Sequence, residues 1–424
     1  MPQAAAEVHQ SAAQPLRVGL LCHQFPVISE TFVATLAASL MRRGHDLRVL
    51  AASAKAPAGA SHAFVREAGI DGKISYAVPS GRFGPGRALA LARGAPSRAL
   101  FLLALAAMDP LFRDKTAVTR LMAASPPFDV VHAQFGYLGL TAMRHRAYGT
   151  LRCRALVVHL RGFDITRFVI ENGEDVYAEL FRKADLFIAN CHHFRDRAIA
   201  LGCDPAKVEV IGSPIDTDRF APPERRAPVE GRAVRTVLVG RLVEKKGISD
   251  AIAAVALLRD TGRNVTLDVL GEGPLRPALE AQIAEAGLQD RVRLHGAADQ
   301  DQVIATLHAA DIALAPSVRA ADGDEDAPVN TLKEAMATEL PVIATRHGGI
   351  PELVIPGENG DLVPERNPQA LADSVAAMLD KPQTWPDMGR AGRQKVIAEY
   401  DHDHIVEKTV RAYETALKRS GDLR

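Results

Sequence analysis

Two basic residues lie five positions apart, just after an apolar run and between two glycines. Residues 237–247 read VLVGRLVEKKG, so Arg241 and Lys246 follow a strand-like segment and precede Gly247, where the backbone can turn tightly. Two fixed cations beside the start of a helix suit the charge of a diphosphate. An isolated R-x4-K is more often a solvated basic loop, so this stretch alone leaves both interpretations open.

A glycine pair provides a second candidate phosphate site. The segment 347–354, HGGIPELV, follows the apolar run PVIAT. Gly348 and Gly349 carry no side chains where a strand would end and a helix begin, and the backbone N–H groups of such a turn can bind phosphate. A plain turn between strand and helix explains the glycines equally well.

A pair of carboxylates provides a third candidate. In DEDAPVNTLKEAMA, residues 324–337, Glu334 lies on an amphipathic helix and Asp326 lies eight residues earlier, in the preceding loop. Carboxylates at that separation can accept hydrogen bonds from two parts of one sugar nucleotide. The alternative is an acidic solvated loop followed by a surface glutamate. The spacing lacks the other ligands of a calcium loop, so we expect no metal.

The residue pattern around these candidates predicts parallel α/β units. Strands are expected at 235–242, 265–273, 292–297, 311–317 and 341–349, alternating with helices at 248–262, 275–288, 301–310 and 330–339. Such alternation is typical of a Rossmann-like doubly wound domain, which places ligands at the carboxyl ends of its strands. The basic pair and the glycine pair both lie at such ends.

The first half of the chain shows the same class of pattern. A helix begins at Ser29 and Glu30, ends at Gly44 and connects two strands in a βαβ unit. The expected strands are 16–26, 47–52, 129–135, 155–162, 186–190 and 208–213. Apolar periodicity lapses over 220–235, where proline and charged residues dominate. We therefore predict two Rossmann-like doubly wound α/β domains that face each other across a cleft.

Composition narrows the class of protein. The chain has 424 residues, 47% apolar and 24% charged, with 51 basic and 51 acidic residues. These values are typical of a soluble globular protein, and the charge balance gives no argument for nucleic acid as a partner. The four cysteines show no metal-like spacing and indicate reduced thiols in a cytosolic protein. The longest nearly apolar run, 99–108, has about half the length of a membrane-spanning helix.

Taken together, the motifs resemble a known family. VGRLVEKKG, LGEGPLRPALE, VRLHGA, ADIALAPS, KEAMATELPVIAT and HGGIPELVIPGENGDLV occur in this order. The ordered set is similar to the C-terminal half of family 4 retaining glycosyltransferases, which have the two-domain glycosyltransferase-B (GT-B) fold. The resemblance covers roughly residues 15–415 and is strongest over 236–365. The segment HQFPVISETFV resembles the branch that builds bacterial exopolysaccharides, including colanic acid and amylovoran enzymes.

The resemblance implies a role for each matched position. Arg241 and Lys246 match the pair that binds the donor diphosphate and stabilises the leaving nucleotide. Glu334 matches the glutamate that holds the nucleotide ribose, and Asp326 occupies the position that faces the donor sugar. The other matched positions are the glycines of the diphosphate turn with their neighbour, and the glycines on the base side: Gly348, Gly349, Ile350, Gly271 and Gly273.

Two departures from the family pattern leave assignments open. The E-x7-E motif is Asp-x7-Glu here, and Glu325 competes with Asp326 for the first position through a one-residue shift. The HGxD motif of the N-terminal domain appears as LRGFD, so Arg161 occupies the position of the histidine that contacts the donor sugar. The alternatives for that contact are His159 and, in the preceding strand, His132, and each also fits an ordinary core histidine.

The resemblance implies a retaining hexosyltransferase that needs no cofactor. A sugar would move from a UDP- or GDP-sugar to a glycan or polyprenyl-diphosphate-linked acceptor during exopolysaccharide assembly. Arg241 and Lys246 would neutralise the departing diphosphate, so neither a metal ion nor a protein nucleophile is required. A nucleotide-sugar epimerase and a degenerate sugar-binding protein are the alternatives. A Rossmann oxidoreductase is disfavoured, because no G-x-G-x-x-G follows the first strand.

The predicted domains divide these tasks. We expect a disordered lead-in at 1–15, an acceptor-binding domain at 16–220, a linker at 221–235 and a nucleotide-sugar-binding domain at 236–400. The remaining residues, 401–424, should form a helix that packs back on the N-terminal domain.

The acceptor side contains a basic segment. Residues 81–108 include four arginines and no acidic residue, and end in the apolar run. This suits docking on an anionic membrane surface near a lipid-linked acceptor, although a buried helix with a basic edge has equal weight. The protein would then be cytoplasmic and peripheral at the inner face of the cell membrane. Glu30 and Thr31 are expected to point into the cleft, toward acceptor or donor.

Overall fold

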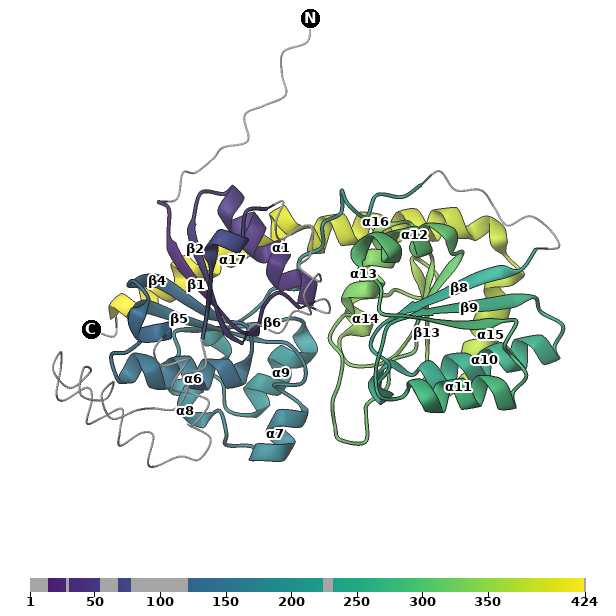
Figure 1. The fold of residues 1–424 in the computed structure, drawn as a ribbon, viewed down its shortest axis with the longest axis horizontal. Coiled ribbons are helices and arrows are strands. Elements are labelled where there is room, and N and C mark those ends of the chain that lie inside the picture. The colour runs from purple at the N-terminus through teal and green to yellow at the C-terminus, as the bar shows by residue number, and fades with distance from the viewer. Residues whose placement is uncertain (1–13, 28–29, 54–67, 78–120, 224–231, 423–424) are drawn as a thin grey trace, which may run out of the picture.

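Two α/β domains lie side by side in the computed structural model of the chain (Figure 1). The structure describes residues 14–27, 30–53, 68–77, 121–223 and 232–422. Each domain contains one parallel sheet. The predicted fold class, two Rossmann-like domains, is therefore confirmed.

The N-terminal sheet has seven strands in the order β3-β2-β1-β4-β5-β6-β7, all parallel. They are β1 (Arg17–Gln24), β2 (Asp46–Ser53), β3 (Ile74–Tyr76), β4 (Phe128–Ala133), β5 (Cys153–Leu160), β6 (Leu186–Ala189) and β7 (Val208–Val210). The helices are α1 (Thr31–Arg42), α6 (Gly136–Ala147), α7 (Arg167–Asn172), α8 (Ala178–Lys183) and α9 (His192–Ala200). Residues 18–22 of β1 are all buried, as expected for a parallel strand covered on both faces.

The C-terminal sheet has six parallel strands in the order β10-β9-β8-β11-β12-β13. They are β8 (Val234–Val239), β9 (Val265–Leu270), β10 (Val292–Gly296), β11 (Ile312–Ala315), β12 (Val342–Thr345) and β13 (Gly360–Val363). The helices are α10 (Ile248–Asp260), α11 (Arg276–Glu285), α12 (Gln300–Ala309), α13 (Asn330–Ala337), α14 (Ile350–Leu353), α15 (Pro368–Leu379) and α16 (Trp385–Tyr400). Strand order reverses between β8 and β11, and ligands of such sheets bind beside the carboxyl ends at this point.

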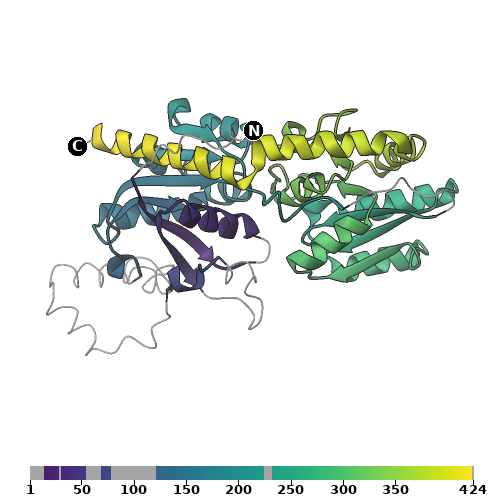
Figure 2. The ribbon, with the colours of Figure 1, turned by 90° about the horizontal axis from the view of Figure 1, so that it is seen from above.

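The chain crosses between the domains twice, and the two crossings pair with each other. The N–H of Ile215 donates to the carbonyl of Tyr400, and the N–H of His402 donates to the carbonyl of Ile215, both at 2.9 Å. Helix α16 lies along the C-terminal domain, and α17 (His402–Asp422) continues along the N-terminal domain (Figure 2). Apolar residues of α17, among them Val406 and Tyr413, are buried with those of β1 and β5. The end of the chain is thus part of the N-terminal core.

Some predictions fall outside the described residues or were incomplete. The basic segment 81–108, Ser29, most of the lead-in and the linker residues 224–231 lie outside them. The sequence analysis did not predict the short strands β3 and β13. Within the described ranges, we find no helix with the length and apolar character needed to span a bilayer.

Candidate active site

The loop after β8 carries three cations to the switch point of the C-terminal sheet. Arg241 lies two residues after the end of β8, and Lys245 and Lys246 lie in a single 3₁₀ turn, Glu244–Lys246. Gly247 ends this turn at φ +60°, and a Cβ there would come 1.8 Å from the carbonyl oxygen of Pro316. Only glycine allows the loop to approach the β11 loop so closely. The Arg241 side chain is exposed, and it has no ion pair with any described residue.

Asp326 gathers the two lysines. Its carboxylate lies 2.7 Å from Lys246 Nζ and 3.3 Å from Lys245 Nζ, and it accepts a hydrogen bond from Ser317 Oγ at 2.9 Å. Lys245 also pairs with Asp324 at 3.0 Å. The loops after β8 and β11 are therefore joined by a nearly buried ion cluster.

The cluster favours the charged forms of Asp326 and Lys245. Burial opposes the charge of Asp326, but the two lysines and Ser317 outweigh it and hold the pKa of this carboxyl well below its usual range. Burial also acts on Lys245, yet Asp326 and Asp324 raise its pKa. Burial lowers the pKa of Lys246 in spite of Asp326.

A histidine bridges Asp326 to the loop after β12. The backbone N–H of Asp326 donates to Nε2 of His347 at 2.9 Å, and Nδ1 of His347 lies 2.7 Å from the Glu365 carboxylate. Because Nε2 accepts, Nδ1 carries the proton and donates to Glu365. This relay fixes the backbone of Asp326 next to the glycine pair.

The glycine pair packs tightly between both domains. Gly348 has φ +49°, and a Cβ there would come 2.1 Å from the carbonyl oxygen of Asp326. A Cβ on Gly349 would come 2.7 Å from Sγ of Cys191 in the N-terminal domain. The N–H groups of Gly349 and Ile350 bond within the protein, to Asp326 and His347. The N–H of Gly348 has no partner among the described residues, so it is the donor of this turn that a phosphate oxygen could use.

The glycines on the base side bring two loops together. A Cβ on Gly271 would come 1.8 Å from the carbonyl oxygen of Gly240, and a Cβ on Gly273 would come 2.4 Å from that of Leu242. The loop after β9 therefore packs directly on the loop that carries Arg241. The observed role of both glycines is this close backbone approach.

Glu334 is a nearly buried carboxylate without a protein partner. It lies on α13, is 7% exposed, and makes no side-chain hydrogen bond or ion pair with the described residues. Burial raises its pKa to about 7, against the opposing charge of Lys333. Thr331 Oγ1 donates to the carbonyl of Val239 at 2.9 Å, which fixes the start of α13 beside the end of β8.

Glu325 faces the other domain. Its carboxylate lies 2.8 Å from Nε2 of His193 on α9 and 3.3 Å from Nε of Arg319. The pKa of Glu325 is lowered, chiefly by the hydrogen bond from His193. The two candidates for the first acidic position therefore have different contacts. Asp326 pairs with Lys245 and Lys246, whereas Glu325 contacts His193 of the N-terminal domain.

Arg161 is buried at the carboxyl end of β5, and all five of its N–H donors are used. Nε donates to the Gln134 carbonyl at 3.1 Å and Nη2 to Gln134 Oε1 at 2.7 Å. Nη1 donates to Ser213 Oγ at 2.9 Å and to Asn190 Oδ1 at 3.3 Å. The fifth hydrogen bond goes to Nδ1 of His159 at 3.1 Å. A direct bond from Arg161 to a donor sugar would require one of these to break.

The two histidines lie behind Arg161. His159 donates from Nε2 to Asn190 Oδ1 at 2.7 Å and accepts from Arg161 at Nδ1, so both ring nitrogens are engaged. His132 stacks on His159 with ring centroids 5.5 Å apart and bonds Tyr413 of α17 at 2.8 Å. Burial lowers the pKa of both rings, which are therefore neutral. Both are core histidines in this structure.

Glu30 lies at the N-cap of α1, close to arginines of both domains. Burial raises its pKa, and the charges of Arg161 and Arg241 oppose this shift. Arg161 also lies over the ring of Phe32, 4.2 Å from the ring centroid, so the first turn of α1 packs on this arginine. Glu30 makes no ion pair with the described residues. Thr31 is the first residue of α1.

Sequence reasoning overlooked several members of the site. Lys245, Ser317, His347 and Glu352 lie inside motifs that were singled out, but the R-x4-K and GG patterns do not distinguish them. His193 gives no signal of its own, because its partner Glu325 is 132 residues away. Long-range pairs of this kind need a structure.

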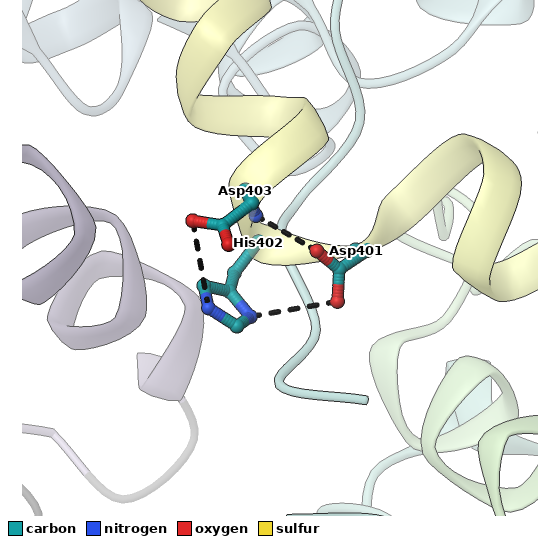
Figure 3. Close-up of side chains that lie close together, drawn as sticks. All are labelled: Asp401, His402 and Asp403. Carbon is teal, nitrogen blue, oxygen red and sulfur yellow. Dashed lines mark hydrogen bonds and ion pairs between the residues drawn. The ribbon is translucent and has the colours of Figure 1, made fainter. Parts of the chain in front are cut away.

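A further cluster lies where the chain crosses back to the N-terminal domain. At the start of α17, the possible metal-ligand atoms of Asp401, His402 and Asp403 lie within 4.8 Å of one another (Figure 3). Asp401 already accepts hydrogen bonds from Thr217 Oγ1 at 2.5 Å and from the N–H of Asp403 at 2.9 Å. His402 lies between the carboxylates, 3.5 Å from Asp401 and 3.8 Å from Asp403. The arrangement is that of a helix cap with a bridging imidazole.

Comparison with known proteins identifies the family. The model for group 1 glycosyl transferases matches residues 225–395, and that for glycosyltransferase family 4 matches residues 29–219. A putative colanic acid biosynthesis glycosyltransferase of Salmonella typhimurium is 32% identical over 415 residues, which cover 92% of this chain and 97% of that protein. The amylovoran biosynthesis glycosyltransferase of Erwinia amylovora is 31% identical over 395 residues, which cover 90% and 95%.

Solved structures agree on the fold. Anabaena HepE in complex with UDP-glucose superposes with a TM-score of 0.72 at 18% identity, covering 94% of this chain and 100% of that one. Sucrose-phosphate synthase of Thermosynechococcus elongatus gives 0.71 at 18% identity, covering 94% and 98%. At this identity the likeness establishes the shared architecture. With the family matches and the near full-length relatives, it shows that the chain belongs to the family 4 glycosyltransferases of the GT-B fold.

Proposed function

We propose that this chain transfers a hexose from a UDP- or GDP-sugar to a glycan or polyprenyl-diphosphate-linked acceptor, with retention of configuration, during exopolysaccharide assembly. The relatives named for colanic acid and amylovoran biosynthesis support the pathway. One observation carries the choice of donor. At the switch point of the C-terminal sheet, neither Arg241 nor Glu334 makes a side-chain hydrogen bond or ion pair with the described residues. A cation for a diphosphate and an acceptor for ribose hydroxyls are therefore available together.

The cations would act on the leaving group. Negative charge grows on the diphosphate as the glycosidic bond breaks, and fixed cations stabilise that charge without reorganisation. Arg241 is available for this, and Lys246 would share its charge between Asp326 and the phosphate. We assign to Asp326 the task of holding the lysines, which leaves Glu325 to approach the donor sugar. The reaction would need no metal, so chelation by EDTA should leave the rate unchanged.

The acceptor would bind on the N-terminal domain, close to Glu30. The proposal includes peripheral association with the inner face of the cell membrane through residues 81–108, which lie outside the described residues. Flotation with anionic vesicles tests this part. Equal recovery of wild type and of a variant with Arg82, Arg87, Arg93 and Arg98 changed to serine would contradict it.

A thermal-shift panel with UDP, GDP, ADP and NAD⁺ tests the donor site. One nucleoside diphosphate should raise the melting temperature of wild type, and Lys246→Ala should abolish this rise. The nucleoside diphosphate that raises the melting temperature identifies the base of the donor. A response to NAD⁺ alone would favour an oxidoreductase, and conversion of the free nucleotide sugar without transfer would favour an epimerase. Binding of sugar without any nucleotide response would favour a non-catalytic protein.

A further inference from the structure

Helix α9 of the N-terminal domain is capped by a carboxylate from the other domain. Glu352, on α14, accepts the N–H of His192 at Oε2 (2.9 Å) and the N–H of His193 at Oε1 (3.0 Å). These are the first two residues of α9, whose own N-cap, Cys191, makes no capping bond with its side chain. Such N–H groups have no intrahelical partner, and a negative charge beside them is favourable.

The capping carboxylate belongs to the same turn as the glycine pair. Glu352 lies three residues after Gly349, which packs against Cys191, and Ile350 between them is fully buried. Movement of α9 away from Glu352 would therefore also uncover the glycine turn.

Two more pairs cross the same junction. His193 bonds Glu325 at 2.8 Å, and Arg167 pairs with Asp322 at 2.8 Å. The second of these pairs is well exposed on both sides, and exposed pairs contribute little. The bidentate bond of Glu352 to backbone donors is the contact with fixed geometry on both sides.

We propose that Glu352 is a positioning residue that latches the two domains by capping α9 and so sets the glycine turn against the N-terminal domain. The proposed function says nothing about how the domains are held, and the latch does not depend on it. Its effect on nucleotide affinity rests on the proposed function. The effect on domain arrangement does not.

Proline substitution removes one latch donor selectively. His192 is the first helical residue of α9, where proline is tolerated because its N–H has no intrahelical partner. Cys191 before it is extended (φ −161°, ψ 166°), as a residue before proline should be. His192→Pro therefore deletes the N–H that Glu352 accepts. His192→Ala is the matched control, because it removes the exposed side chain and keeps the N–H.

The full chain is examined by small-angle X-ray scattering without ligand, and by calorimetry with UDP and GDP. Glu352→Ala, which removes both hydrogen bonds, and His192→Pro, which removes one, should each enlarge the radius of gyration. Nucleotide binding should weaken by about tenfold in His192→Pro, the effect of one charge-assisted hydrogen bond, and by more in Glu352→Ala. His192→Ala should match wild type. The double variant Glu352→Ala/His192→Pro should be no worse than Glu352→Ala alone, because both changes break one interaction.

Each outcome decides. Scattering equal to wild type in Glu352→Ala, or fully additive effects in the double variant, would overturn the latch. Changed scattering without nucleotide binding by any variant or by wild type would uphold the latch and contradict the proposed function. If His192→Pro lowers the helix content, Glu352→Gln replaces it, since one carboxylate oxygen is then lost and an intermediate effect is expected.

Discussion

Two arginines, each at the carboxyl end of a strand in one of the two domains, differ in burial and in hydrogen bonding. Arg161, after β5, is 7% exposed and donates all five of its hydrogen bonds to protein acceptors. Arg241, after β8, is exposed and has no ion pair with the described residues. Both follow a parallel strand, so position alone does not distinguish them. The two guanidinium groups differ in their surroundings. Protein acceptors surround that of Arg161, which stabilises the fold, whereas that of Arg241 is accessible to a ligand.

The same contrast appears among the carboxylates. Asp326 is saturated by two lysines and a hydroxyl, whereas the nearly buried Glu334 makes no side-chain hydrogen bond or ion pair with the described part of the chain. A buried carboxylate without a partner is costly to the fold, and such costs are typical of binding sites. The C-terminal face therefore carries groups that are available to a ligand, whereas Arg161 on the N-terminal face has used all its donors.

The largest expected effect is on stability, from Arg161→Met. This change takes the Arg161 donor away from buried acceptors on Gln134, Ser213 and His159, and should lower the free energy of unfolding by about 3–5 kcal/mol. Urea unfolding followed by circular dichroism measures it. Arg154→Met is the control: this arginine is exposed, pairs with Asp129, and should cost less than about 1 kcal/mol. Equal losses of unfolding free energy in Arg161→Met and Arg154→Met would contradict the structural role assigned to Arg161.

Arg241→Ala should have the opposite profile. Stability should change by less than about 0.5 kcal/mol, because the side chain is exposed and forms no ion pair with the residues that the structure describes. Turnover of the nucleotide sugar should fall by about 10²–10³-fold, the usual result of removing one group that stabilises a departing charge. Release of nucleoside diphosphate measures it. Arg263→Ala, which breaks an exposed pair with Asp380, serves as control. A loss below threefold for Arg241→Ala would remove this residue from the site.

The contrast marks the limit of sequence-based prediction here. The alternation of apolar runs predicts the strands of the C-terminal sheet, and the motifs predict that Arg241 and Lys246 follow the first of them, as the structure shows. They do not reveal that Arg161 has used its donors, because its partners Gln134, Asn190 and Ser213 are 27 to 52 residues away. Saturation of a polar group is a property of tertiary contacts. A motif identifies residues near a ligand, but not which of them remain available.

A smaller effect should appear in the pH dependence of nucleotide binding. The ionised carboxylate of Glu334 accepts stronger, charge-assisted hydrogen bonds from ribose hydroxyls than the protonated acid does. Because burial raises the pKa of Glu334 to about 7, affinity should fall about tenfold from pH 8 to pH 6. Glu334→Gln should bind weakly at both values. Lys333 also titrates near here, because burial lowers its pKa to about 7. Lys333→Met should therefore keep the pH dependence and move it to higher pH, since this cation lowers the pKa of Glu334.

Stability should change with pH in the opposite direction at Glu334. Its pKa is raised from the ordinary value of 4.5, so the folded state binds the proton more tightly than the unfolded state. This contribution is present at low pH and is lost as pH rises through the raised value. Urea unfolding of wild type and Glu334→Gln at pH 5 and pH 8 tests the sign. A loss of stability with rising pH that is as large in Glu334→Gln as in wild type would assign it to other groups.

The smallest effect concerns His402, at the crossing between the domains. Unlike Glu334, this titratable group lies close to carboxylates of the protein, those of Asp401 and Asp403. The Asp401 carboxylate, 3.5 Å from the ring, raises the pKa of His402 above 6.5, although burial and Arg42 oppose the shift. A raised histidine stabilises the fold fully below pH 6.5, and this contribution is lost as pH rises through the folded value. Asp403 is mostly exposed, so the gain should stay below about 1 kcal/mol. Unfolding of wild type and His402→Gln at pH 6 and pH 8.5 measures it. If the two proteins differ more at pH 8.5 than at pH 6, the imidazole acts there as a neutral packing group and the crossing is held by Thr217 and Asp401 instead.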